Sequence, residues 1–130
     1  MIVVDSSVIL EVLLATPAAA EIRQRIFARK ETLHAPHLID LEVAQVLRRY
    51  VASGDMSDVR GFEAIQDFLD LSITRYPHEL FLTRIWELRN NITAYDAAYV
   101  ALAEALMVPL LTRDSRLAST SKHNAKIELI

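Results

Sequence analysis

Short apolar runs alternate along the chain with longer segments in which apolar residues recur every three or four positions. The short runs are typical of buried strands, and the recurring pattern indicates amphipathic helices. Strands that alternate with helices predict a parallel α/β sheet. We therefore expect five strands, the last of them at an edge of the sheet: Ile2–Val4, Thr32–Ala35, Leu71–Arg75, Val108–Thr112 and Lys126–Ile130.

Helical patterns fill the intervals between these runs. Thr16 and Pro17 are expected as the cap and the first residue of one helix, and Gly54 suits the end of another. The length of 130 residues is typical of one domain, so we expect 1–130 to form a single domain. The expected helices are Ser6–Leu14, Thr16–Arg29, Pro36–Ala52, Ser57–Asp70, a segment from Pro77 to Arg89, and Thr93–Met107.

Four carboxylates lie where a folding chain rarely places them: Asp5, Glu42, Asp96 and Asp114. Asp5 and Asp114 follow expected strands, at the end of a parallel sheet where binding sites form. Glu42 and Asp96 lie beside the apolar stripes of expected helices. A buried carboxylate needs a partner charge or a metal. Carboxylate oxygens are the ligands that Mg²⁺ and Mn²⁺ prefer, and such ions hydrolyse phosphodiesters, so the four suggest a metal-dependent nuclease.

Each carboxylate also has a structural alternative. Asp5 and Asp114 would serve equally as helix caps, and Thr93 with Asp96 resembles a capping box. Glu42 borders an apolar helical stripe, and its structural alternative is an ion pair with an arginine such as Arg49. That stripe is expected to consist of Ile39, Val43, Val46 and Tyr50.

Composition narrows the function classes. The net charge of −3 provides no general attraction for nucleic acid. The absence of cysteine excludes disulfides, zinc–thiolate sites and cysteine nucleophiles. With only two glycines, Gly54 and Gly61, a glycine-rich phosphate loop is excluded. We expect Trp86 in the core.

The amino-terminal segment carries Asp5 and Glu11 and lacks a basic leader, so we expect no signal peptide. No uncharged stretch approaches the roughly 20 residues that a membrane helix needs. Both observations, with the lack of cysteine, favour a cytoplasmic protein.

Four motifs resemble those of the PIN-domain family, specifically the VapC-type toxins of prokaryotic toxin–antitoxin systems. The segments Met1–Val8 and Asp40–Leu47 are similar to the first two acidic motifs, which contain Asp5 and Glu42. The segments Thr93–Glu104 and Leu111–Leu117 are similar to the last two. The resemblance covers the chain in length and in motif order.

This resemblance implies a three-layer α/β/α fold around a central, mainly parallel sheet of about five strands. It also implies a Mg²⁺- or Mn²⁺-dependent endoribonuclease for single-stranded RNA, a VapB-like antitoxin as inhibitor, and a homodimer. The acidic pocket would consist of Asp5, Glu42, Asp96 and Asp114. Ser6 and Thr112 would support it, and Arg113 and Arg116, which flank Asp114, would hold phosphates. The helices Thr16–Arg29 and Arg48–Asp70 are the expected walls of an apolar groove for a partner.

Three other functions remain open from the sequence. The same fold would serve a non-catalytic metal- or RNA-binding module. A phosphoryl-accepting receiver domain also uses aspartates at strand ends, although it needs a second acidic residue where this chain has Ser6. A PIN-domain nuclease of RNA processing, outside toxin–antitoxin systems, would carry the same motifs.

Overall fold

The computed structural model describes residues 1–130 and contains one five-stranded sheet in which every neighbouring pair of strands is parallel. The strand order is β3-β2-β1-β4-β5. This confirms the expected α/β class and the edge position of the last strand. The strands are β1 Ile2–Val4, β2 Leu33–Pro36, β3 Ile73–Tyr76, β4 Leu110–Thr112 and β5 Ile127–Leu129.

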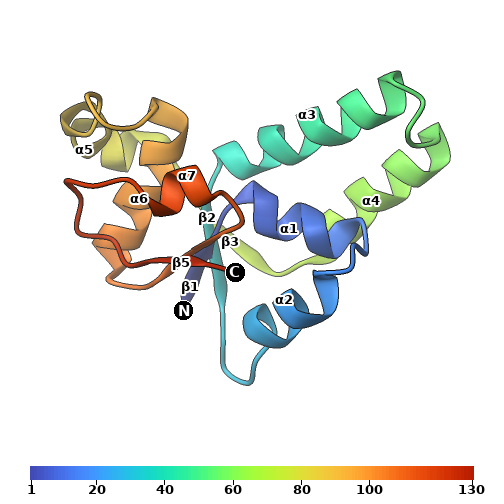
Figure 1. The fold of residues 1–130 in the computed structure, drawn as a ribbon, viewed down its shortest axis with the longest axis horizontal. Coiled ribbons are helices and arrows are strands. Elements are labelled where there is room, and N and C mark those ends of the chain that lie inside the picture. The colour runs from blue at the N-terminus through green and yellow to red at the C-terminus, as the bar shows by residue number, and fades with distance from the viewer.

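Two helical layers enclose the sheet (Figure 1). The connections from β1 to β2 and from β2 to β3 step in one direction along the sheet. The connection from β3 to β4 leads back across the sheet, and the connection from β4 to β5 continues along its other half. Because parallel crossovers are right-handed, the first two connections lie on one face and the last two on the other. The first face carries α1 Ser6–Leu13, α2 Ala19–Ile26, α3 Leu38–Ala52 and α4 Asp58–Asp70. The second carries the 3₁₀ turn η1 His78–Phe81, α5 Leu82–Glu87, α6 Ala94–Leu106 and α7 Ser115–Ala118.

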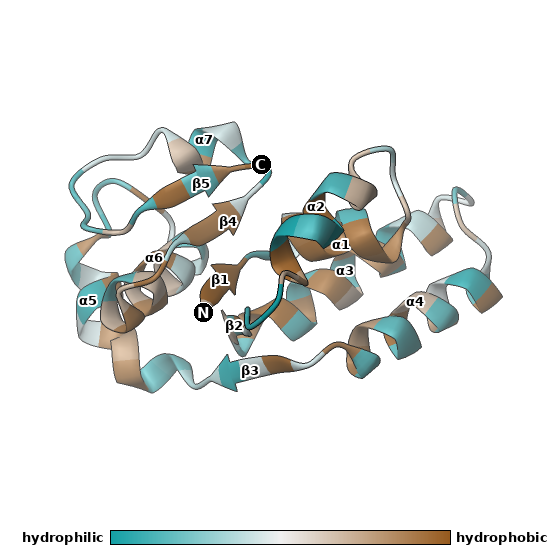
Figure 2. Ribbon diagram, turned by 90° about the horizontal axis from the view of Figure 1, so that it is seen from below, coloured by the Kyte–Doolittle hydropathy of each residue, from teal (hydrophilic) through white to brown (hydrophobic).

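The core lies between the sheet and these two layers. All three residues of β1 are buried, since β1 is the central strand, and Figure 2 shows it as hydrophobic along its length. Helix α6 is buried without a break from Ala97 to Ala103, which agrees with its nearly all-apolar sequence. None of the helices combines the length and the apolar content that a membrane crossing requires.

Two helix starts differ from the expectation. Helix α2 begins at Ala19, not at Thr16, because the Thr16 hydroxyl turns back to hydrogen-bond the Glu11 carboxylate. That earlier partner removes Thr16 from the capping role. Pro36 belongs to β2, and α3 begins two residues later at Leu38. A proline has no N–H for the sheet, but it can end a strand.

Some apolar side chains lie outside the core where the sequence placed them inside. Trp86 is 67% exposed and stacks against Arg89, whose guanidinium carbon lies 4.6 Å from the ring centroid. In α3 the buried stripe is Ile39, Val43 and Leu47, and Tyr50 is exposed. The expected positions of Trp86 and Tyr50 were therefore wrong. Both rings lie on helices whose other face meets the core.

Candidate active site

The acidic residues gather at the carboxyl ends of β1 and β4. These neighbouring strands are the point where the direction of the connections reverses, which is where open α/β sheets form their binding sites. Val4 is paired with Leu111, so the next residues, Asp5 and Thr112, lie side by side. The Asp5 N–H donates to the Leu111 carbonyl at 3.2 Å, which extends the pairing to the end of the strand.

Asp5 is the most enclosed of the four carboxylates, at 6% exposure. Ser7 Oγ donates to its Oδ1 at 2.5 Å, and Thr112 Oγ1 donates to its Oδ2 at 2.5 Å. The Val8 N–H also donates to Oδ1, at 3.2 Å. Burial raises the pKa of Asp5 above its ordinary value, although these three hydrogen bonds oppose the rise. The carboxylate is thus held in place yet lacks a counter-charge.

Glu42 projects from α3 and is joined to α6 by one short contact. Tyr99 Oη donates to Glu42 Oε1 at 2.5 Å. Burial raises the pKa of Glu42, the hydrogen bond from Tyr99 opposes this, and the charges of Asp5 and Asp96 add to the rise. The Ser6 hydroxyl also acts on Glu42, and it lowers the pKa of that group. Ser6 therefore supports Glu42, whereas the serine that donates a hydrogen bond to Asp5 is Ser7.

Asp96 lies in the first turn of α6. Its backbone N–H donates to Thr93 Oγ1 at 3.2 Å, so Thr93 caps the helix as expected. Burial raises the pKa of Asp96; the charge of Arg116 lowers it, and that of Asp114 raises it. The helix dipole favours a carboxylate at the amino terminus of a helix. Because Thr93 provides the cap, the Asp96 carboxylate is also available to the site.

Asp114 closes the acidic group and caps α7. Its Oδ1 accepts from the N–H groups of Arg116 at 2.9 Å and Leu117 at 3.4 Å. The Asp114 N–H donates to Thr112 Oγ1 at 2.9 Å. Thr112 is fully buried, and its one hydroxyl donates to the Asp5 carboxylate and accepts from the Asp114 backbone, so it links the two residues.

Hydrogen bonds at the acidic group join β1 to β4, through Asp5 and Thr112, and α3 to α6, through Glu42 and Tyr99. Asp5 and Asp114 are caps as well as members of the group, so the two interpretations of these residues are compatible. Glu42 forms no ion pair with Arg49 or with any other residue; its partner is Tyr99. Sequence reasoning missed Ser7 and Tyr99. The hydroxyl type and helical spacing of Tyr99, three residues after Asp96, were the available signals.

The two predicted phosphate-binding arginines differ in their surroundings. Arg116 Nη2 lies 3.4 Å from Asp114 Oδ2 and 3.9 Å from Asp96 Oδ2. Arg113 points elsewhere: its Nε lies 3.7 Å from Glu11 Oε1, and its guanidinium donates to the Ile130 carbonyl. The backbone N–H of Arg113 donates to Ser7 Oγ at 3.0 Å and so orients the serine that holds Asp5.

The donor chemistry of this group suits a hard divalent ion, since every ligand candidate is a carboxylate oxygen. The carboxylates also repel one another, which a cation would relieve. In this structure, however, no three Asp, Glu, His or Cys side chains lie close enough to hold an ion together. Arg116 lies between Asp96 and Asp114, and hydroxyl groups occupy both oxygens of Asp5.

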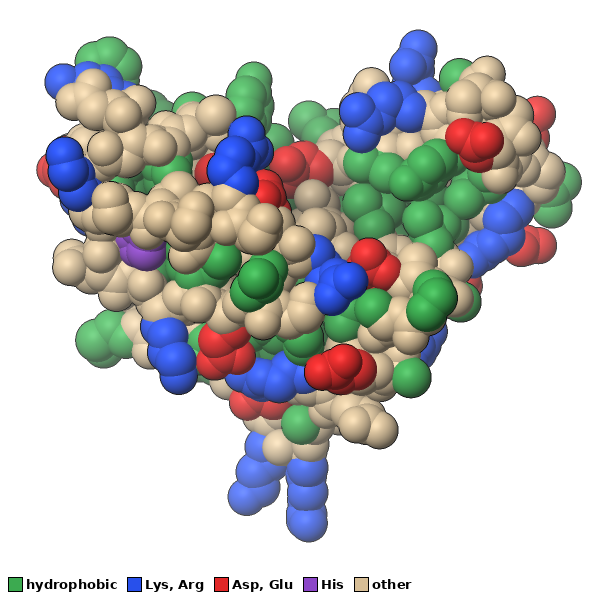
Figure 3. Space-filling view, viewed as in Figure 1, with side chains coloured by type: hydrophobic (Ala, Val, Ile, Leu, Met, Phe, Trp, Pro, Cys, Tyr) green, Lys and Arg blue, Asp and Glu red, His purple; other side chains and the backbone are tan.

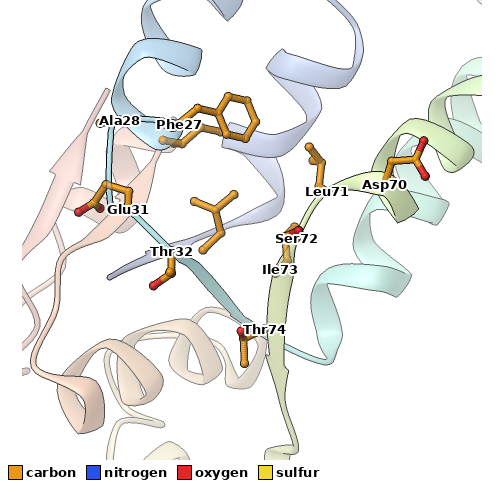
Figure 4. A pocket seen from close by; sticks show the side chains of 11 residues that line it. Phe27, Ala28, Glu31, Thr32, Asp70, Leu71, Ser72, Ile73 and Thr74 are labelled. Atoms are coloured by element: carbon orange, nitrogen blue, oxygen red, sulfur yellow. The ribbon is translucent and has the colours of Figure 1, made fainter.

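Acidic side chains line a notch on the face shown in Figure 3, beside basic side chains. The larger cavities lie elsewhere. One of about 570 Å³ opens at the amino ends of β2 and β3, between Phe27 and Leu71, at the opposite end of the sheet from Asp5 (Figure 4). Another of about 430 Å³ is an apolar groove between α3 and α4, lined by Leu47, Val51 and Phe62 among others. Of the two expected groove walls, only Arg48–Asp70 lines this groove; helix α2, within the expected wall Thr16–Arg29, does not.

The protein is thus an α/β/α domain with an acidic group of four carboxylates: Asp5 and Asp114 follow its central strands, and Glu42 and Asp96 lie on α3 and α6. The model of the PIN domain matches residues 2–123, and the chain belongs to the PIN domain family. This membership also excludes the receiver-domain alternative.

Curated relatives and solved structures agree with the assignment. The chain is 45% identical to Ribonuclease VapC12 of Mycobacterium tuberculosis over 130 residues, which is all of this chain and 99% of that protein. It is also 45% identical to Ribonuclease VapC9 of the same species, over 100% of this chain and 98% of that protein. PAE2754 from Pyrobaculum aerophilum has a similar fold, with a TM-score of 0.70 at 23% identity over 97% of this chain and 81% of that one. VapC20 of M. tuberculosis, a toxin that cleaves the sarcin–ricin loop, has a TM-score of 0.66 at 15% identity over 93% and 97%.

Proposed function

We propose that this protein is a divalent-metal-dependent endoribonuclease for single-stranded RNA and the toxin of a VapBC-type toxin–antitoxin system. One observation carries the proposal: four carboxylates from four separate elements lie near the carboxyl ends of β1 and β4, with a single cationic side chain between two of them. The full-length similarity to proteins named as VapC ribonucleases supports the substrate class.

In this proposal Asp5, Asp96 and Asp114 hold Mg²⁺ or Mn²⁺, and Glu42 holds a second ion or orients the attacking water. When bound, the metal would supply a water made nucleophilic near neutral pH and would stabilise charge on the phosphate. Ser7 and Thr112 fix the two oxygens of Asp5 by hydrogen bonds. These fixed positions would restrict the carboxylate to the orientations that serve a ligand.

The remaining residues act on the RNA and on proton movement. Glu42, with its raised pKa and its bond to Tyr99, is suited to accept a proton from the water. Arg116 faces the acidic centre and is placed to hold a phosphate. Arg113 would first have to leave Glu11, so it is the less well placed of the two.

We further propose a VapB-like antitoxin as the partner and the α3–α4 groove as the place where an apolar segment of it docks. The solved complex of VapBC2 from Rickettsia felis has the same fold, with a TM-score of 0.66 over 99% of this chain. The groove is apolar and carries Arg48 on one wall and Asp58 on the other.

A homodimer is part of the same proposal. In the proposed dimer a second copy would cover exposed apolar side chains on η1, α5 and α6. We also propose that residues 1–130 act as one domain and in the cytoplasm, where the RNA substrate lies. The exposed apolar residues are Leu80, Leu82, Trp86 and Tyr95.

The test compares purified wild type with Asp5→Asn and Asp96→Asn on a mixed pool of single-stranded RNA, in Mg²⁺, in Mn²⁺ and in chelator. Wild type should cleave with metal, and either chelator or either substitution should abolish cleavage. Asp40→Asn is the matched control, because Asp40 pairs with Arg75 at the surface and not with the acidic centre. Equal cleavage by wild type and Asp96→Asn would refute the proposal.

A further inference from the structure

A single cation, Arg116, lies beside the acidic group, and it contacts two of the four carboxylates. No lysine, arginine or histidine lies within 4.0 Å of Asp5 or Glu42, and the only one within that distance of Asp96 and Asp114 is Arg116. The guanidinium of Arg116 therefore occupies the region where Asp96 and Asp114 would both have to bind an ion.

Arg116 can leave this position without disturbing the fold. Its side chain is 78% exposed and forms no hydrogen bond with any other residue than Asp114. A small cavity of about 100 Å³, lined by Asn91, Thr93 and Thr120 among others, lies beside it. Asp114 does not depend on the guanidinium for its orientation, because the backbone N–H groups of Arg116 and Leu117 hold Oδ1 independently.

We propose that Arg116 is a built-in counter-ion of the acidic centre, which a divalent metal displaces from Asp96 and Asp114 and which then binds a phosphate of the RNA. This inference rests on the proposed function of the site. It assigns to one side chain two successive partners, the carboxylates in the metal-free protein and the RNA backbone in the metal-bound protein.

The chemistry of the two ions supports this order. An exposed ion pair at 3.4 to 3.9 Å is weak, so a divalent ion with oxygen ligands competes well against it. A guanidinium released beside the metal still lies next to the bound backbone, and its planar fork matches a phosphate. Metal binding would thus create a phosphate site, and metal and RNA would each increase the affinity for the other.

The first experiment measures Mn²⁺ binding alone, by the loss of the free-ion resonance signal at neutral pH, in the absence of RNA. Arg116→Ala should bind Mn²⁺ about two- to fivefold more tightly than wild type, because the ion no longer displaces a pair of the strength typical of exposed bridges. Arg116→Lys keeps the charge and should remain close to wild type. The matched control is Arg49→Ala, an exposed arginine of α3 that forms no ion pair and should change the affinity less than about twofold.

The second experiment measures cleavage of a single-stranded RNA oligonucleotide at saturating Mn²⁺. Arg116→Ala should raise KM several-fold, and Arg116→Lys should also raise it, since an ammonium lacks the fork. The proposal requires opposite signs: tighter metal and weaker RNA in Arg116→Ala. Mn²⁺ affinity that is unchanged or lower in that variant overturns the inference and leaves the nuclease proposal intact. Failure of wild type to bind Mn²⁺ at all would overturn both.

Discussion

Tyr99 Oη lies 2.5 Å from Glu42 Oε1, which ties the buried face of α6 to α3 across the acidic centre. Tyr99 is 2% exposed, so its hydroxyl has no route to bulk water and depends on Glu42 for a hydrogen bond. Burial raises the pKa of Tyr99, and the charge of Glu42 adds to that rise. Tyr99 therefore donates a hydrogen bond to Glu42 but does not release its proton.

Tyr99→Phe should lower the free energy of unfolding by about 1–3 kcal/mol, the range for a hydrogen bond to a charged group. A double-mutant cycle with Glu42→Gln, followed by denaturant titration in chelator, measures the coupling between the two. We expect the second substitution to cost clearly less once the first is present. Strict additivity of the two losses would mean that the contact contributes nothing to stability.

Thr112→Val should damage two carboxylates at once. Valine fills the same fully buried space but removes the donor to Asp5 and the acceptor for the Asp114 N–H. We expect a loss of about 1–3 kcal/mol in unfolding free energy, since buried polar groups lose their partner. RNA cleavage should fall as well.

Thr112→Ser retains the hydroxyl and should preserve most of the activity. Thr74→Val on β3 is the matched control at an exposed position of the sheet, and should leave both stability and cleavage close to wild type. Activity in Thr112→Val equal to that of Thr112→Ser would contradict the role of this hydroxyl.

Asp96→Asn should melt at a higher temperature than wild type in chelator, because burial disfavours the charge of Asp96 and because that charge repels Asp5, Glu42 and Asp114. Loss of the attraction to Arg116 offsets part of the gain, so we expect an increase of about 1–4 °C. Added Mn²⁺ should raise the melting temperature of wild type more than that of the variant, since only wild type retains the full ligand set. A variant that melts lower in chelator would indicate that Asp96 serves mainly its helix.

His34 should make folding stability fall in mild acid. Its imidazole is buried on β2, with Nε2 2.8 Å from Thr32 Oγ1 and Nδ1 2.8 Å from Tyr76 Oη. Burial lowers the pKa of His34 below 6.5, so the unfolded chain takes up this proton more readily than the folded one. Stability from this group is therefore complete above pH 6.5 and is lost as the pH falls through the lowered pKa.

The measurement for His34 is denaturant unfolding between pH 5 and pH 8 in chelator. His34→Gln should show a flatter decline on the acid side than wild type, because it lacks the imidazole whose pKa burial lowers. His37→Gln is the control at an exposed position. Parallel pH profiles for wild type and His34→Gln would rule out this histidine as the source.

Much of the fold follows from local patterns in the sequence. Apolar runs define β1 and β4, and continuous apolar character defines α6, because burial on both sides of a layer leaves no room for polar positions. Thr93 at the start of α6 and Ser57 at the start of α4 were recognisable as caps, since a cap acts within three residues. Thr16 does not cap the next helix because its hydroxyl hydrogen-bonds the Glu11 side chain and not a backbone group of that helix.

The acidic residues themselves were also visible in the sequence, because a carboxylate at a strand end or beside an apolar stripe is costly and therefore informative. What the sequence alone could not determine was which hydroxyl meets which carboxylate. Ser7 rather than Ser6 holds Asp5, since the turn from β1 into α1 directs the second serine back to the strand end. Thr112 reaches Asp5 only because β1 and β4 pair in one register.

Tertiary structure alone decided the long-range partners. Tyr99 meets Glu42 across 57 positions of the sequence, and no local pattern contains that contact. Arg116 lies between Asp96 and Asp114, whereas its neighbour Arg113 turns to Glu11. Side-chain type and local spacing determine which residues can take part in a site, because those properties belong to the chain itself. The packing of one helix on another determines which of them meet, because that packing depends on the whole core.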